Sequence, residues 1–92
     1  MNHRYASSEI SSKRRLNQVR EVTKAMNIVM DYLDDRRTEY VEFQAIQNHV
    51  DSVAPRITAG AIIIAVRMLR THHMIWPSES FEVTMNSFKI AN

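Results

Sequence analysis

Two adjacent histidines, His72 and His73, are the residues of this 92-residue chain whose type most directly suggests metal chemistry. Neighbouring residues point in different directions on a helix, whereas a helical zinc pair needs ligands four residues apart. His49 and Glu79 would complete a site only if the fold gathered them, because no ligand spacing in the sequence supports one. We therefore interpret these histidines as surface or packing residues and predict no metal site.

Residues that act as acids, bases or nucleophiles also lack partners at a useful spacing. Carboxylates are paired at Asp34 and Asp35 and at Glu39 and Glu42, but no neighbouring group suggests separate acid and base roles. The serine pairs have no histidine or aspartate partner, and a single glycine excludes a glycine-rich phosphate loop. The sequence therefore predicts a protein that is not an enzyme and that binds no cofactor or small-molecule substrate.

Positive charge is concentrated near the N-terminus. Residues 1–37 carry eight Lys and Arg against five Asp and Glu, a balance of +3, whereas residues 38–92 carry four against five, a balance of −1. Within residues 13–24 the balance is +4, so this stretch is the natural contact for a polyanion. The alternative is that these charges solvate an exposed helix face. The residues that we expect to contact DNA phosphates are Arg14, Arg15, Arg20 and Lys24.

Length and composition predict one soluble domain. A chain in which 45% of the residues are apolar can bury a core, although a domain this short is marginally stable alone and gains from association. It has no Cys, and no secretory signal precedes its first charges. The longest apolar stretch, residues 59–66, is far shorter than the ~20 residues of a membrane span. We expect a flexible tail over residues 1–11, a single domain over 12–92, no membrane contact and a cytoplasmic location.

A long helix is predicted over residues 13–33, capped by Ser11 or Ser12. Apolar residues recur there at spacings of three and four and form a stripe like that of a coiled coil. Val22 and Val29 widen the stripe, which favours packing against a core over a bare coiled-coil seam. A dimer-forming coiled coil is the alternative, and both hold if the stripe extends past the core. The stripe consists of Leu16, Val19, Thr23, Met26, Met30 and Leu33.

The middle of the chain predicts a short strand and a second helix. Residues 38–41 have the β-branched and aromatic character of a strand. Residues 42–50 have the period of a helix. Pro55 ends this helix in a turn over residues 51–56, because proline lacks an amide hydrogen and biases the preceding residue towards extended backbone.

A third helix over residues 57–71 contains the densest apolar run of the chain. Thr58 is placed to cap its start. One face of this helix should enter the core, because its apolar residues are spaced by four and three. That face consists of Ile62, Val66 and Leu69.

A β-hairpin is predicted after the third helix. Residues 74–76 form its first strand, and residues 81–85 form its second, because apolar and polar residues alternate there. Residues 87–90 are expected to add a third strand or a packed tail, with Phe88 and Ile90 pointing inward. The predicted fold is thus mainly α-helical with a small hairpin, in the order helix, strand, helix, helix, strand, strand.

This order resembles the winged helix-turn-helix superfamily, and the residue types extend the likeness over residues 40–85. Apolar residues in the second helix resemble those of the family, as does an apolar pair three residues apart followed by a second pair entering the wing. The resemblance implies a DNA-binding protein, with the third helix in the major groove and the hairpin against the backbone. The residues that carry it are Phe43, Ile46, Val50, Val66, Leu69, Met74 and Ile75.

Two functions follow from the third helix. The first is a double-stranded DNA-binding transcriptional regulator, monomeric or dimeric, whose groove contacts are Arg56, Thr58, Arg67, Arg70 and Thr71. The second is an interaction module that docks on a larger transcription or replication protein, or on a second copy, through Ile63, Ile64 and Met68. Bases are read mainly by Arg, Lys, Asn and Gln, yet this helix is apolar on most sides. Glu79 and Glu82 make the hairpin acidic, which suits phosphates poorly.

Overall fold

The computed structural model describes residues 3–37, 39–78 and 82–91, with side chains from Arg15 onward. It is mainly helical, with one three-stranded antiparallel sheet in the order β1-β3-β2, and the predicted order of helices and strands is confirmed. One short 3₁₀ turn, η1, was not predicted. The elements are α1 His3–Asp34, β1 Val41–Glu42, α2 Phe43–Val53, α3 Ala59–Thr71, β2 Ile75–Trp76, η1 Val83–Met85 and β3 Ser87–Ile90.

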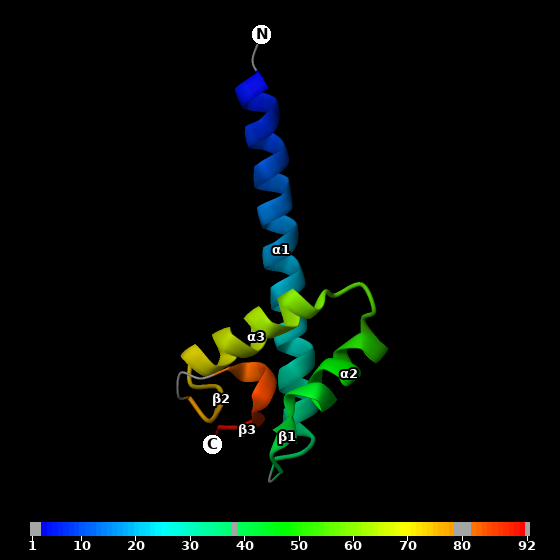
Figure 1. Cartoon of the computed structure of the whole chain (residues 1–92), viewed down its shortest axis with the longest axis vertical. Helices are drawn as coiled ribbons and strands as arrows, with labels where there is room; N and C mark the ends of the chain where they lie inside the picture. The colour runs from blue at the N-terminus through cyan, green and yellow to red at the C-terminus, as the bar shows by residue number, and fades with distance from the viewer. Residues whose placement is uncertain (1–2, 38, 79–81, 92) are drawn as a thin grey trace.

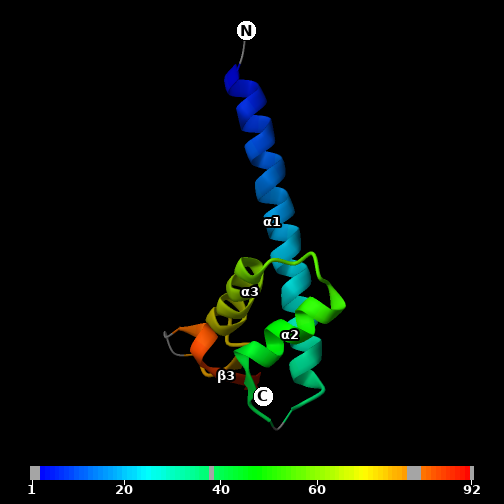
Figure 2. The ribbon, with the colours of Figure 1, turned by 45° about the vertical axis from the view of Figure 1, so that its right-hand side comes forward.

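Helix α1 is longer than the sequence predicted. It begins at His3, so the predicted start at Ser11 or Ser12 is wrong, and residues 3–11 of the expected tail are helical. No Gly or Pro interrupts this stretch, and nothing else in it forces the chain out of a helix. The other elements surround only the C-terminal half of α1, and the N-terminal half projects from the domain in both views (Figures 1 and 2). The molecule therefore measures 58 × 27 × 21 Å.

The apolar stripe of α1 divides between core and solvent. Ala25, Val29 and Leu33 are fully buried and form one wall of the core. Leu16 and Val19, at the other end of the stripe, are 50% and 61% exposed. The prediction of a core helix thus holds for the C-terminal half of α1, and the stripe does extend past the core.

Helix α2 packs its predicted face against the core, but residues 51–53, which were predicted as turn, are helical. Its buried residues are Phe43, Ile46 and Val50. At its start, the Phe43 amide donates to the Asn86 carbonyl at 3.0 Å, which joins the helix to the segment before β3. It extends to Val53, close to the limit that Pro55 imposes.

Helix α3 begins and packs as the sequence predicted. The Thr58 hydroxyl accepts a hydrogen bond from the Ala61 amide at 3.2 Å, which is the expected N-cap. Ile62, Val66 and Leu69 are buried against α1 and the sheet. After the helix, His73 adopts a φ of 57°, the left-handed conformation that usually favours glycine at a helix end. The Met74 amide then donates to the Leu69 carbonyl at 2.9 Å and closes the turn.

The predicted hairpin pairs different strands from those expected. β2 pairs with β3, with Ile75 opposite Ile90 and Trp76 opposite Lys89, so the pairing of residues 74–76 with residues 81–85 is wrong. Residues 83–85 form η1 instead, and residues 79–81 lie outside the described part of the chain.

Residues 87–90 alternate in polarity as residues 81–85 do. The burial of their apolar side chains explains why they form the strand that pairs with β2. Phe88 and Ile90 point inward as predicted, and β3 lies between both other strands. β1 is shifted by comparison with the predicted residues 38–41, and its Val41 lies opposite Phe88. None of the described helices combines the length and apolar character that crossing a membrane requires.

Candidate functional site

The basic residues of α1 do not form a single patch. Arg15, Arg20 and Lys24 are all exposed, while the side chain of Arg14 lies outside the described residues. Because successive helical residues turn by about 100°, Arg20 and Lys24 share one face and Arg15 lies on another. Arg15 instead borders a groove between α1 and α3. Arg56 is exposed in the turn before α3, far along the chain from the basic residues of α1.

The hydroxyl and the amide of Thr58 both form hydrogen bonds that fix the start of α3. Its hydroxyl caps the helix, and its amide donates to Oε1 of Glu21 at 2.7 Å. The carboxylate of Glu21 therefore stands at the N-terminus of α3, where the helix dipole favours negative charge. Glu21 was missed by the sequence reasoning, because it appeared only as one acid within a basic stretch and its partner lies 37 residues away.

The exposed basic residue at the centre of α3 has an acidic partner. Nη2 of Arg67 lies 3.6 Å from Oε1 of Glu82, just before η1. The Thr71 hydroxyl donates to the Arg67 carbonyl at 2.8 Å, so it satisfies its own helix. Arg70 is half-buried in the last turn. Of the predicted groove contacts on α3, Arg67 is thus partly neutralised and Thr58 and Thr71 make local bonds.

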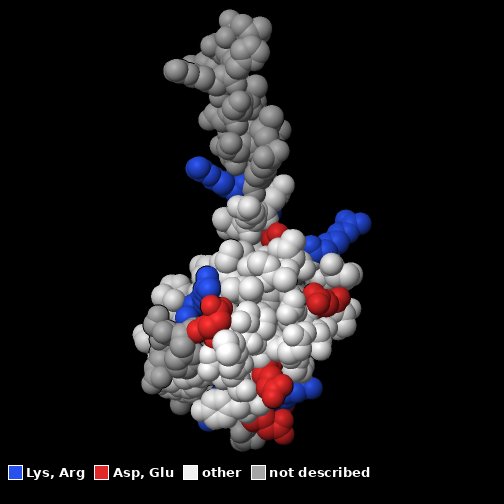
Figure 3. All heavy atoms as spheres, in the orientation of Figure 1, with Lys and Arg blue, Asp and Glu red and all other residues white. Residues whose placement is uncertain are grey.

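The exposed apolar residues of α3 lie beside α1. Ile64 and Met68 are 47% and 40% exposed, and Ile63 is half-buried against the core. Figure 3 shows scattered charges, rather than one basic band, on the face that carries α3. Between α3 and α1 lies a groove of about 360 Å³, which we call the Met68 groove. It is lined by Arg15, Gln18, Val19, Val22, Thr23, Ile64 and Met68.

A second depression adjoins the Met68 groove. It has a volume of about 310 Å³, and we call it the Gly60 hollow. A Cβ on Gly60 would meet no atom within 4 Å, so the α3 backbone borders open space here. The lining residues are Gln18, Glu21, Val22, Thr58, Gly60, Ala61 and Ile64, of which Gln18, Val22 and Ile64 also line the Met68 groove.

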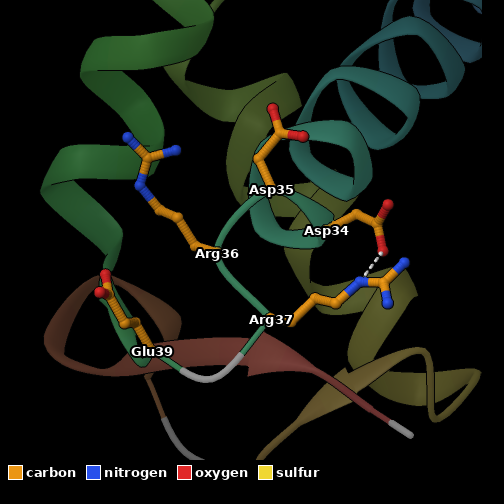
Figure 4. Close-up of a pocket in the computed structure, with 5 residues that line it drawn as sticks. All are labelled: Asp34, Asp35, Arg36, Arg37 and Glu39. Atoms are coloured by element: carbon orange, nitrogen blue, oxygen red, sulfur yellow. Dashed lines mark ion pairs between the residues drawn. The ribbon is translucent and has the colours of Figure 1, made fainter.

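The connector between α1 and β1 forms a polar depression of about 480 Å³. Figure 4 shows the side chains of Asp34, Asp35 and Glu39 pointing in different directions, with no common focus. Asp34 pairs with Nε of Arg37 at 3.5 Å. Within the described residues, no three metal-ligating side chains come close enough to hold an ion. This depression therefore offers charge but no arrangement for acid–base or metal chemistry.

The histidines considered from the sequence take separate places. His49 stacks on Tyr32 with ring centroids 4.1 Å apart, and the Arg36 guanidinium lies 4.1 Å from the centroid of the Tyr32 ring. His72 and His73 are exposed at the end of α3. His49 thus contributes to packing between α1 and α2.

Comparison of the chain with known protein families, curated proteins and solved structures finds no match. The surface formed by α1 and α3 is therefore interpreted from its own residues. Exposed apolar side chains and two adjoining depressions are its main features, and Arg15, Glu21 and Arg67 are its charged residues.

Proposed function

We propose that this chain is a winged-helix domain that acts as a non-enzymatic protein-interaction module through α3 and the adjoining part of α1. The order of elements and the sheet order β1-β3-β2 support the winged-helix fold. One observation carries the function. Where a reader of DNA bases would present polar side chains, α3 presents Ile64 and Met68 beside an apolar groove.

The electrostatics of α3 support the same proposal. Arg67 is the basic residue at the centre of the exposed face, and Glu82 competes with a phosphate or a base for its guanidinium. Charged groups that remain near the groove, such as Arg15, stand at its rim. An apolar centre with a charged rim is the usual arrangement of a protein interface.

The experiment is affinity capture with the purified chain as bait, from a lysate that also contains a differently tagged copy of the chain, followed by quantification of the captured proteins. Ile64→Asp is expected to abolish capture of one defined partner while the circular dichroism spectrum stays unchanged, because residue 64 is half exposed. Lys24→Ala, on the opposite side of α1, serves as the control and is expected to retain the partner. Equal capture by the wild type and Ile64→Asp would contradict the proposal.

A second candidate, DNA binding, is favoured by one specific observation. Arg20 and Lys24 are exposed one helical turn apart on α1, where they can contact successive phosphates. Duplex binding should then weaken with salt, with log K falling by about 0.9 per log unit of salt for each phosphate neutralised. Absence of binding at about 50 mM salt, or binding without that slope, would eliminate this candidate.

A further inference from the structure

The residues that line the Met68 groove complement those that line the Gly60 hollow in shape and in charge. The groove is bordered by a projecting thioether, Met68, and by the cation of Arg15. The hollow is bordered by a position without a side chain, Gly60, and by the anion of Glu21. Ile64 belongs to the wall that the two depressions share.

We propose that this face binds the same face of a second copy of the chain, in a dimer whose two-fold axis passes beside Ile64. Gly60 and Met68 lie four residues before and four residues after Ile64, on one row of the α3 surface. A two-fold axis perpendicular to α3 makes the two α3 helices antiparallel. Met68 of each copy then enters the Gly60 hollow of the other, as an isologous interface requires.

Charge complementarity selects the second copy as the occupant. The same rotation that exchanges the two depressions brings Arg15 of one copy to the side of the other copy that holds Glu21. Arg15 is exposed and Glu21 is half-buried, so a cation is available where an anion already stands. The pair occurs twice in the dimer, once on each side of the axis.

Gly60 supplies an independent reason for a close partner. Glycine is a poorer helix former than alanine, and the single glycine of this chain is the second residue of α3. It has no positive φ, and a Cβ at this position would meet no atom of its own chain within 4 Å. Within a single copy, nothing therefore requires glycine at this position. In the proposed dimer, glycine allows Met68 of the second copy to approach the α3 backbone.

The exposed end of the α1 stripe lies along the same face. Val19 lines the Met68 groove, and Leu16 follows one turn towards the N-terminus. Leu16 and Val19 are 50% and 61% exposed, and the N-terminal part of α1 projects from the domain (Figure 1). Isolated helical segments are marginal in water, so a partner that covers Leu16 and Val19 also stabilises this half of α1.

This inference rests on the proposed interaction surface and is tested by sedimentation equilibrium of the full chain over a range of concentrations. The expected species has twice the monomer mass of 10.7 kDa. Met68→Asp is expected to weaken association at least tenfold, because a carboxylate would enter a hollow that already holds the carboxylate of Glu21. The matched control is Met85→Asp, since Met85 is 83% exposed and lines neither depression.

Gly60→Met tests the hollow itself. A Cβ at this position meets no atom of its own chain within 4 Å, so the fold is expected to survive with an unchanged circular dichroism spectrum, while the dimer is lost. A wild type that stays at 10.7 kDa at every concentration would overturn the inference. So would a dimer that persists in both Met68→Asp and Gly60→Met.

A cysteine placed at the axis gives a geometric readout, because the chain has no Cys of its own. Ile64→Cys is expected to form a disulfide-linked dimer under mild oxidation, since a disulfide needs Cα atoms within about 7 Å. Met85→Cys is the control and should stay unlinked. Equal linking of the two variants would contradict the axis. If the wild type is monomeric and Ile64→Asp still abolishes capture of another protein, the dimer fails while the proposed function stands.

Discussion

Ile62 and Ile64 lie two residues apart on α3 and differ completely in environment. Ile62 is fully buried in the core, whereas Ile64 is half exposed beside the Met68 groove. The inward face of α3 is explained by the fold of one chain. The outward face also presents apolar side chains, because Ile64 and Met68 are 47% and 40% exposed. The inward face of this helix packs in the core, and we propose that the outward face packs against a partner protein.

The largest expected difference in unfolding free energy is between alanine substitutions of Ile62 and Ile64. Ile62→Ala removes fully buried methyl groups and should lower the free energy of unfolding by about 2–5 kcal/mol. Ile64→Ala should lower it by less than about 1 kcal/mol, because much of that side chain is already in water. Urea denaturation of both variants under conditions that keep the chain monomeric checks the pair. Equal losses would mean that the orientation of α3 is wrong.

The next effect concerns the bond that fixes α3 on α1. Glu21→Ala removes the carboxylate that accepts from the Thr58 amide and should cost about 1–2 kcal/mol of unfolding free energy. Asp31→Ala, at an exposed position of the same helix, is the control and should stay within about 0.5 kcal/mol of the wild type. Thermal melts compare them. If Glu21→Ala matched its control, the Glu21 bond would contribute nothing to the position of α3.

A smaller effect of opposite sign is expected at the outward face. Gly60→Ala should raise the free energy of unfolding of the monomer by less than about 1 kcal/mol, because alanine is the better helix former, residue 60 lies in the first turn of α3, and no atom obstructs its Cβ. The same change should weaken self-association. Denaturation at low concentration and sedimentation at high concentration measure the two effects separately. A destabilised monomer would show that Gly60 is required inside the chain after all.

The smallest effect is expected for the ion pair on α3. Both side chains of the Arg67–Glu82 pair are about half exposed, at 53% and 51%. Arg67→Ala should therefore change the free energy of unfolding by less than about 1 kcal/mol. Chemical denaturation provides the measurement. A larger loss would show that the pair holds η1 against α3.

The sequence predicted the elements whose apolar residues follow a regular period. Ile62, Val66 and Leu69 identified the inward face of α3, and Thr58 identified its start, because capping is a local property. The strand pairing was not predictable, since residues 81–85 and 87–90 both alternate in polarity. Only the packing of Phe88 and Ile90 into the core decides between them.

The candidate surface was predicted in part. Ile63, Ile64 and Met68 stood out as apolar residues in excess of one core face, and Ile64 and Met68 do line the groove. The partners of Thr58 and Arg67 were not predictable. Glu21 is far from Thr58 in the sequence, and Glu82 is far from Arg67. Contacts between such residues depend on the tertiary arrangement.

The most direct test of the interface is the rate at which peroxide oxidises Met68 relative to Met85, read by mass spectrometry. Both thioethers are accessible in an isolated chain, so their rates in dilute solution provide the reference. At high concentration, or in a lysate freed of nucleic acid, Met68 should be protected several-fold while Met85 is unchanged. Equal rates under all conditions, or protection of Met68 only after duplex DNA is added, would contradict a protein interface on α3.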